Sequence, residues 1–238
     1  MKLSLSEPKP WRPSNLDLVL SMALAIGLPL LAGLLYDVTG ALIPMMIYYA
    51  AAWGIVKWRR GQTGYLNKPR KKLPVPFIVN IILVSIALAF AFIERVPNPA
   101  PDVNGVVVSA IIWPIANAST EQLLWIYIFE AWDLRFPWNG GKKASPKNWT
   151  CKVIGLLLNS IFIGMIHVLY WAKFLTTVEA KSAFGVAFIL LTTVTGYMHL
   201  WTWRDSNQML FTFIPHYLLN LLPFFWTGYS LLPFLVQL

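Results

Sequence analysis

The chain has 238 residues, of which 57% are hydrophobic and only 12% carry a charged side chain, and its formal net charge is +9. Soluble domains carry a charge on about a quarter of their residues, so this composition excludes an ordinary water-soluble domain. We therefore predict an all-α fold, a polytopic bundle of transmembrane helices that forms a single membrane domain over residues 1–238.

Apolar runs recur along the whole chain between charged or Pro/Gly-rich breaks. A helix that crosses the hydrocarbon core needs about 20 mainly apolar residues. A last run, residues 223–238, is short and contains two prolines, so a half-span or interfacial helix fits it as well as an eighth span does. We expect seven or eight spans, the first seven at residues 17–36, 41–57, 75–93, 106–129, 153–172, 183–203 and 207–222.

The basic residues predict the orientation of these spans, because Lys and Arg are retained in cytoplasmic loops. With a cytoplasmic N-terminus, all but three of the 19 Lys and Arg residues fall on the inside, the exceptions being Arg95, Lys173 and Lys181. This predicts a multi-pass integral membrane protein whose loops at 57–74 and 133–152 are cytoplasmic. The charge is then a topology signal that needs no nucleic-acid partner, and membrane lipids are the expected surroundings.

A few ionisable residues fall inside the predicted spans. Glu121 lies near the middle of the fourth span, and His167, His199 and His216 all lie in apolar segments. Charged groups cost about 2.5–3.5 kcal/mol in a bilayer on insertion scales and mark functional sites. Asn220 follows His216 by four positions, which places both on one helical face. A carboxylate that activates water, with imidazole and amide groups that stabilise an oxyanion, suits hydrolysis.

Other interpretations of the same residues stay open. Polar side chains also bridge helices by hydrogen bonds without any catalytic role. We interpret His199 as a packing or interfacial histidine. A zinc ion bound by Glu121, His167 and His216 would have acceptable ligand types, although no H-E-x-x-H motif is present. Tryptophans near the span ends indicate an aromatic belt rather than a substrate cage; they are Trp53, Trp58, Trp132, Trp171, Trp201 and Trp203.

Three short motifs occur in order on three of the predicted spans. Residues 121–126 read E-Q-L-L-W-I, residues 163–167 read I-G-M-I-H and residues 216–220 read H-Y-L-L-N. They resemble the E-E-x-x-x-R, F-x-x-x-H and H-x-x-x-[ND] patterns of the CAAX-protease and bacteriocin-processing (CPBP, or Abi) family of intramembrane glutamic endopeptidases. This family includes the type II CAAX prenyl endopeptidase. The motif-bearing core covers about residues 106–222.

The resemblance implies a role for each matching residue. Glu121 and His167 would activate a water molecule, and His216 with Asn220 would form the oxyanion site. It further implies a site without metal or cofactor, and a lipid-proximal or prenylated peptide as substrate. Three positions depart from the family pattern: Gln122 replaces the second Glu, Ile126 the Arg and Ile163 the Phe. We expect Gln122 to support the site without taking part in the chemistry, so that its replacement by Ala has little effect.

Two other classes of function compete with hydrolysis. The altered first motif also fits a catalytically degenerate family member that acts as a membrane immunity or scaffold protein. A proton-coupled transporter could use the Glu and His residues as a relay, but no inverted repeat is visible in the sequence. The predicted boundaries also place His167 nearer the external surface than Glu121 and His216, and a shared site requires those boundaries to shift.

Overall fold

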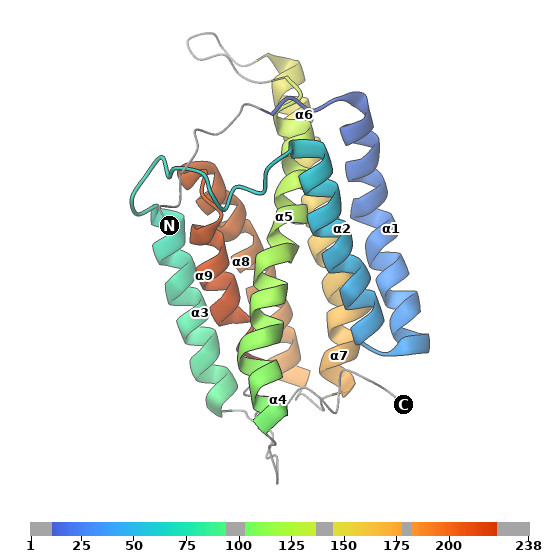
Figure 1. The fold of residues 1–238 in the computed structure, drawn as a ribbon, viewed down its shortest axis with the longest axis vertical. Coiled ribbons are helices and arrows are strands. Elements are labelled where there is room, and N and C mark those ends of the chain that lie inside the picture. Colours follow the sequence, from blue (N-terminus) through green and yellow to red (C-terminus); the bar gives the residue numbers. More distant parts are fainter. Residues whose placement is uncertain (1–10, 94–102, 137–144, 178–181, 223–238) are drawn as a thin grey trace.

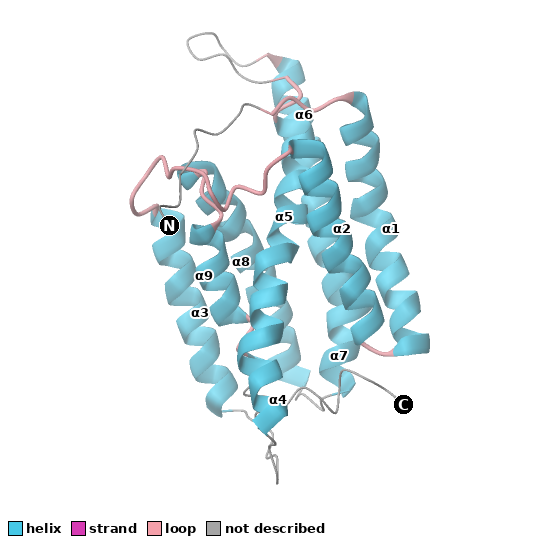
Figure 2. Ribbon diagram, viewed as in Figure 1, coloured by secondary structure: helices cyan, strands magenta, loops and turns pink. Residues whose placement is uncertain are grey.

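The computed structural model describes residues 11–93, 103–136, 145–177 and 182–222, and every regular element in these residues is a helix (Figure 2). The predicted all-α class is therefore confirmed for this part of the chain. The helices run alongside one another in a bundle (Figure 1). In chain order they are α1 (Asn15–Thr39), α2 (Leu42–Arg60), α3 (Val75–Ile93), α4 (Val103–Val107), η1 (Val108–Ile112), α5 (Trp113–Asp133), α6 (Pro146–Ile166), η2 (His167–Trp171), α7 (Ala172–Thr177), α8 (Ser182–Ser206) and α9 (Leu210–Leu219).

Two of the long helices contain a π-helical turn. The elements α4, η1 and α5 follow one another without a break, and so do α6, η2 and α7. A π-helical turn accommodates one extra residue and widens the helix locally, and such turns are frequent at functional sites. The described residues thus form seven continuous helices, one at each of the seven predicted apolar runs.

Four of these helices are long and apolar enough to cross a membrane. They cover Asn15–Thr39, Val75–Ile93, Val103–Asp133 and Pro146–Phe174. The predicted count of seven or eight spans is not supported, because α2 ends in three basic residues and α9 has only 10 residues. The eighth candidate, residues 223–238, lies outside the described residues.

Helix α5 occupies the centre of the bundle. Every residue from Thr120 to Ala131 is buried, so this part of the helix has no exposed apolar or polar face. It packs against α1, α2, α6, α8 and α9. It approaches α6 closely, since a Cβ atom on Gly155 would lie 2.6 Å from the carbonyl oxygen of Phe129. Glu121, the catalytic candidate on α5, therefore lies in the part of this helix that other helices surround.

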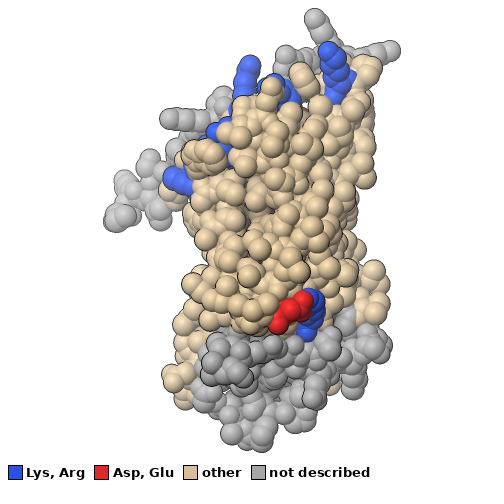
Figure 3. All heavy atoms as spheres, turned by 90° about the vertical axis from the view of Figure 1, so that its right-hand side faces the viewer, with Lys and Arg blue, Asp and Glu red and all other residues tan. Residues whose placement is uncertain are grey.

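The outer faces of the bundle are apolar. Large aliphatic side chains that are more than half exposed include Leu34 on α1, Ile82 on α3 and Leu190 on α8. So much exposed apolar surface is costly in water and matches the hydrocarbon interior of a bilayer. Figure 3 shows one such face, on which a wide band without charged residues separates the charged groups near the two ends.

We call the end where α1 begins and α2 ends the basic end. Among the described residues, four ion pairs there join different helices or loops: Arg59 with Asp17 at 2.8 Å, Arg60 with Glu130 at 3.0 Å, Lys71 with Asp205 at 2.8 Å and Arg204 with Asp133 at 2.6 Å. The opposite end has the pair of Lys173 and Asp37 at 2.6 Å.

The loop between α2 and α3 lies across the basic end and is bound to the turn between α8 and α9. Met209 N–H donates to the carbonyl oxygen of Gly64 at 3.1 Å, and the Gln208 side chain donates to the carbonyl oxygen of Tyr65 at 3.0 Å. Asn67 Nδ2 donates to the carbonyl oxygen of Asn207 at 3.1 Å. These bonds place the Tyr65 side chain against α5.

Candidate active site

The four predicted site residues line a single cavity inside the bundle. Glu121 comes from α5, His167 is the first residue of η2, and His216 and Asn220 lie at the end of α9. The space in which the centre of a water molecule fits is about 20 Å³, which is room for one water. The remaining wall is formed by Trp113, Trp125, Trp171, Thr192 and Leu219.

The mismatch in depth that the predicted boundaries gave does not exist in the structure. The fifth span, predicted at 153–172, is part of a continuous helix that runs from Pro146 through η2 to Thr177. His167 is therefore well inside this helix and not near its end. The predicted boundaries were wrong because they followed apolar residues only, and this helix extends beyond its apolar part at both ends.

Glu121 is 4% exposed, and its Oε2 atom lies 3.4 Å from Nε2 of His216. A carboxylate in a site with little water interacts strongly with any neighbouring charge or dipole. Its partner is an imidazole, a group that can gain or lose a proton. The geometry thus gives Glu121 a neighbour with which it can exchange a proton.

The π-helical turn η2 places two residues at the cavity. His167 begins the turn and Trp171 ends it, and both line the cavity wall. Nδ1 of His167 lies 2.7 Å from the carbonyl oxygen of Ile163. Because a carbonyl oxygen can only accept, Nδ1 carries the hydrogen and Nε2 is left as an acceptor.

His216 is held between two rings. The Trp125 ring lies 5.1 Å away, centroid to centroid, and the His199 ring lies 5.2 Å away in an edge-on arrangement. Nδ1 of His216 is hydrogen-bonded to Oε1 of Gln122. Among the described residues, Nδ2 of Asn220 has no hydrogen-bond partner although it is buried, so it is a donor available to a group in the cavity.

His199 is a packing residue, as one of the two sequence interpretations stated. It is fully buried and is absent from the cavity wall. Its ring packs edge-on against Trp125, and its Nδ1 atom is hydrogen-bonded to the carbonyl oxygen of Thr195. It therefore packs against the His216 ring and helps to hold that ring in position.

The aromatic-belt interpretation is wrong for two of the tryptophans. Trp171 lines the cavity, and Trp203 is 2% exposed with its indole N–H donating to Oε1 of Glu130 at 2.7 Å. Trp58 and Trp201 are at least half exposed. Proximity to the end of a predicted span was a poor guide because both helices are longer than their apolar runs.

The sequence reasoning missed Trp113, Thr192 and the contact between Gln122 and His216. One signal for Trp113 was present, since Trp113, Glu121 and Trp125 are spaced by eight and four residues and so lie on one face of a helix. No comparable signal identified the contact of Gln122, because its partner is 94 residues away.

The zinc option has no geometric support in the structure. In the described ranges, no three His, Cys, Asp or Glu side chains are grouped so that they could hold a metal ion. Zinc sites need three or four such ligands that converge on one point.

Comparisons of this chain with protein-family models, with curated proteins and with solved structures find no match.

Proposed function

We propose that this chain is an integral, multi-pass membrane endopeptidase of the CPBP type, which hydrolyses a peptide bond close to the membrane. The observation that supports it is the convergence of Glu121, His167, His216 and Asn220 on one buried cavity with room for a water molecule. These are the four positions that the motif resemblance assigns to chemistry.

In the proposed reaction, His167 orients a water molecule and Glu121 takes a proton from it. The water oxygen attacks the carbonyl carbon of the peptide, and the developing oxyanion accepts hydrogen bonds from His216 and Asn220. The proton then passes from Glu121 to the amide nitrogen and the C–N bond breaks. The products are a carboxylic acid and an amine, and Glu121 returns to its starting state.

The substrate in this proposal is a lipid-proximal peptide, of which a prenylated peptide is one form. The cavity wall contains three tryptophans and Leu219, which offer apolar contacts to such a chain. Membrane lipids contact the apolar outer faces of the bundle, and neither a cofactor nor a nucleic acid takes part.

The proposal includes the membrane topology, with the N-terminus and the basic end in the cytoplasm. Beside the four long apolar helices, α2 with 19 residues and α8 with 25 are each long enough to cross, at 1.5 Å per residue. The 10 residues of α9 reach about halfway. A total of seven or eight crossings would require residues 223–238, which lie outside the described residues, to contribute to a crossing as well.

The replacement Glu121→Gln tests the reaction. It keeps the size of the side chain but removes the base, so turnover of a farnesylated peptide in liposomes should fall by about 10²–10⁴-fold while the protein stays folded. His167→Ala should have a similar effect, and Asn220→Ala should cost about 10²–10³-fold. Asp205→Asn, which changes an exposed carboxylate at the basic end, is the matched control and should keep full turnover.

Three outcomes separate the candidate functions. Full turnover by Glu121→Gln would show that the hydrolytic mechanism is wrong. Proton-coupled flux without peptide cleavage would favour a transporter. If the wild type neither cleaves nor transports and Glu121→Gln unfolds the bundle, the carboxylate is structural, and the degenerate immunity or scaffold protein that Gln122 and Ile126 favour is the better description.

A further inference from the structure

A chain of hydrogen bonds leads from Tyr65, in the loop at the basic end, to His216, whose ring faces the buried carboxylate of Glu121. The Tyr65 hydroxyl donates to the carbonyl oxygen of Ser119 at 2.8 Å, and it accepts from Nε2 of Gln122 at 3.2 Å. Oε1 of Gln122 is bonded to Nδ1 of His216, and Nε2 of His216 faces Glu121.

The donor and acceptor of every hydrogen bond in this chain follow from the first bond, that between Tyr65 and the carbonyl oxygen of Ser119. A backbone carbonyl has no hydrogen, so the Tyr65 hydroxyl must donate to Ser119 and has its lone pair left for Gln122. Burial raises the pKa of Tyr65 above its usual value, which keeps the hydroxyl protonated. The Gln122 amide must then point its NH₂ group at Tyr65 and its oxygen at His216, so Nδ1 of His216 must carry a hydrogen.

We propose that Tyr65 and Gln122 are positioning residues that fix the tautomer of His216, so that only its Nε2 atom can exchange a proton with Glu121. Since Nδ1–H is bonded to Gln122, His216 can donate to an oxyanion only through Nε2. The form competent for attack therefore has a protonated Nε2 on His216 beside an ionised Glu121. The catalytic part of this inference rests on the proposed function, whereas the tautomer does not.

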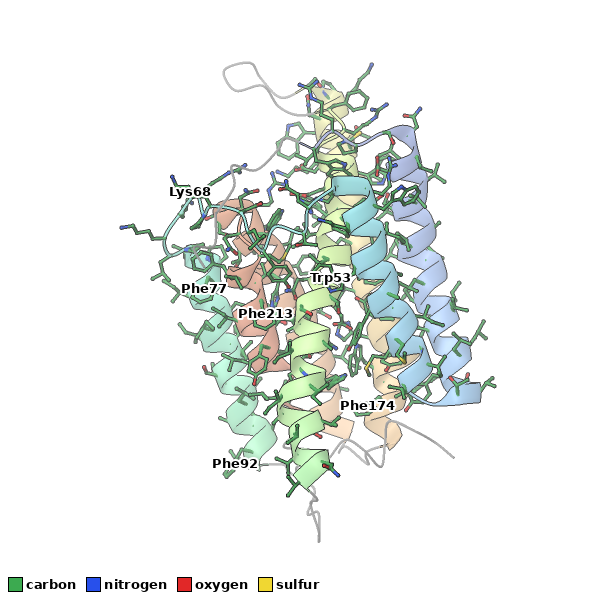
Figure 4. All side chains as sticks on the ribbon, in the orientation of Figure 1. Trp53, Lys68, Phe77, Phe92, Phe174 and Phe213 are labelled. Carbon is green, nitrogen blue, oxygen red and sulfur yellow. The ribbon has the colours of Figure 1, made fainter. Side chains whose placement is uncertain are left out.

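The surroundings make this arrangement rigid. The Tyr65 ring stacks on Trp53 at 6.1 Å between centroids and meets Phe213 edge-on at 6.4 Å; Figure 4 labels both of these residues. Gln122 is fully buried and His216 is 2% exposed. The Gln122 amide therefore cannot turn without losing its hydrogen bonds to Tyr65 and His216. This revises the expectation that replacement of Gln122 has little effect.

Nitrogen-15 NMR of the full chain in liposomes, with ring-labelled histidine, tests the tautomer without any substrate. The His216 signals are identified by their loss in His216→Gln. In the wild type, Nδ1 of His216 should show the shift of a protonated nitrogen. Gln122→Leu and Tyr65→Phe should convert part or all of that signal to the unprotonated shift, while Gln122→Glu, which keeps an acceptor, should retain it.

Tyr217→Phe is the matched control, because it also removes a hydroxyl that donates to a backbone carbonyl, but the partner is Ala110, at 2.9 Å, and not a residue of the chain that leads to His216. It should leave the His216 signals unchanged. An unprotonated Nδ1 in the wild type, or an unchanged tautomer in both Gln122→Leu and Tyr65→Phe, would overturn the inference.

Peptide hydrolysis is measured on the same variants. Gln122→Leu should lower kcat by about 10–100-fold, as the loss of other groups that orient an imidazole does, and Gln122→Glu should restore most of it. A wild type with the expected tautomer but without hydrolysis would contradict the proposed function alone. Hydrolysis that survives a changed tautomer would contradict the positioning role alone.

Discussion

The two buried glutamates of α5 have partners of different kinds. Glu130 pairs with Arg60 at 3.0 Å and accepts the indole N–H of Trp203, whereas Glu121 faces the imidazole of His216 at 3.4 Å. A guanidinium keeps its charge in a protein, but an imidazole changes charge near neutral pH. We therefore interpret Glu130 as structural and Glu121 as the carboxylate that can exchange a proton.

Removal of one member of the Arg60–Glu130 pair tests this difference. Arg60→Ala leaves the Glu130 carboxylate buried without its cation, so the free energy of unfolding should fall by about 3–5 kcal/mol. Arg60 also lies over the rings of Trp11 and Trp203, at 5.4 and 5.1 Å. Denaturation of the purified protein in detergent measures the loss.

Lys71→Ala is the matched control for this prediction. It breaks the pair of Lys71 and Asp205, a contact of 2.8 Å between side chains that are 58% and 37% exposed. Exposed pairs contribute about 0–1 kcal/mol, so this variant should unfold almost as the wild type does. Equal losses in the two variants would mean that the Arg60–Glu130 pair has no special role.

Helix α5 carries Glu121 and α6 leads directly into His167, so we expect the crossing of these two helices to influence the distance between the two side chains. The crossing is close because Gly155 has no side chain where α6 meets the carbonyl oxygen of Phe129. Small residues allow membrane helices to approach in this way. The position of His167 against Glu121 thus depends on a glycine 12 residues earlier in the chain.

Gly155→Ala should separate the two helices. Its Cβ would lie 2.6 Å from backbone, which cannot move as easily as a side chain, so we expect a loss of about 1–3 kcal/mol in the free energy of unfolding and a lower turnover. Gly164→Ala lies on the same helix and meets nothing within 4 Å, so it should be neutral or slightly stabilising. Thermal unfolding and peptide hydrolysis of both variants check the prediction, which fails if the two behave alike.

Helix positions could be predicted from the sequence better than helix ends. Seven apolar runs gave seven helices, because burial in either protein or lipid requires apolar side chains. The start of α6 at Pro146 could have been recognised from Ser145 at the N-cap and Pro146 at the first position. The π-helical turns could not be recognised from the sequence, because they depend on contacts between helices and leave no pattern in the chain.

Across the whole molecule, the four predicted residues that line the cavity could be singled out because polar groups stand out in apolar segments. The three tryptophans of the cavity wall could not be predicted, because a tryptophan in an apolar helix gives the same sequence pattern whether it faces lipid, core or cavity. The role of Gln122 was hidden for a related reason: a motif compares residues along the chain, but the tautomer of His216 depends on Tyr65 from a distant loop.

Three single cysteines in a Cys151→Ser background test the predicted membrane topology. Lys68 and Lys147 are exposed at the basic end, and Val38 is 83% exposed in the last turn of α1, at the opposite end. With the basic end in the cytoplasm, a membrane-impermeant maleimide should label Val38→Cys on intact cells. It should label Lys68→Cys and Lys147→Cys only after the cells are permeabilised.

The physical reason is that basic residues resist translocation, and those described here gather at one end of the bundle, except for Lys173, which pairs with Asp37 at the other. The experiment also decides whether α2 crosses, because Val38 precedes this helix and Lys68 follows it. Labelling of both from the same side would place α2 within one leaflet. Labelling of Lys68→Cys alone on intact cells would mean that the bundle has the opposite orientation. The basic end, with the loop that contains Tyr65, would then face the outside.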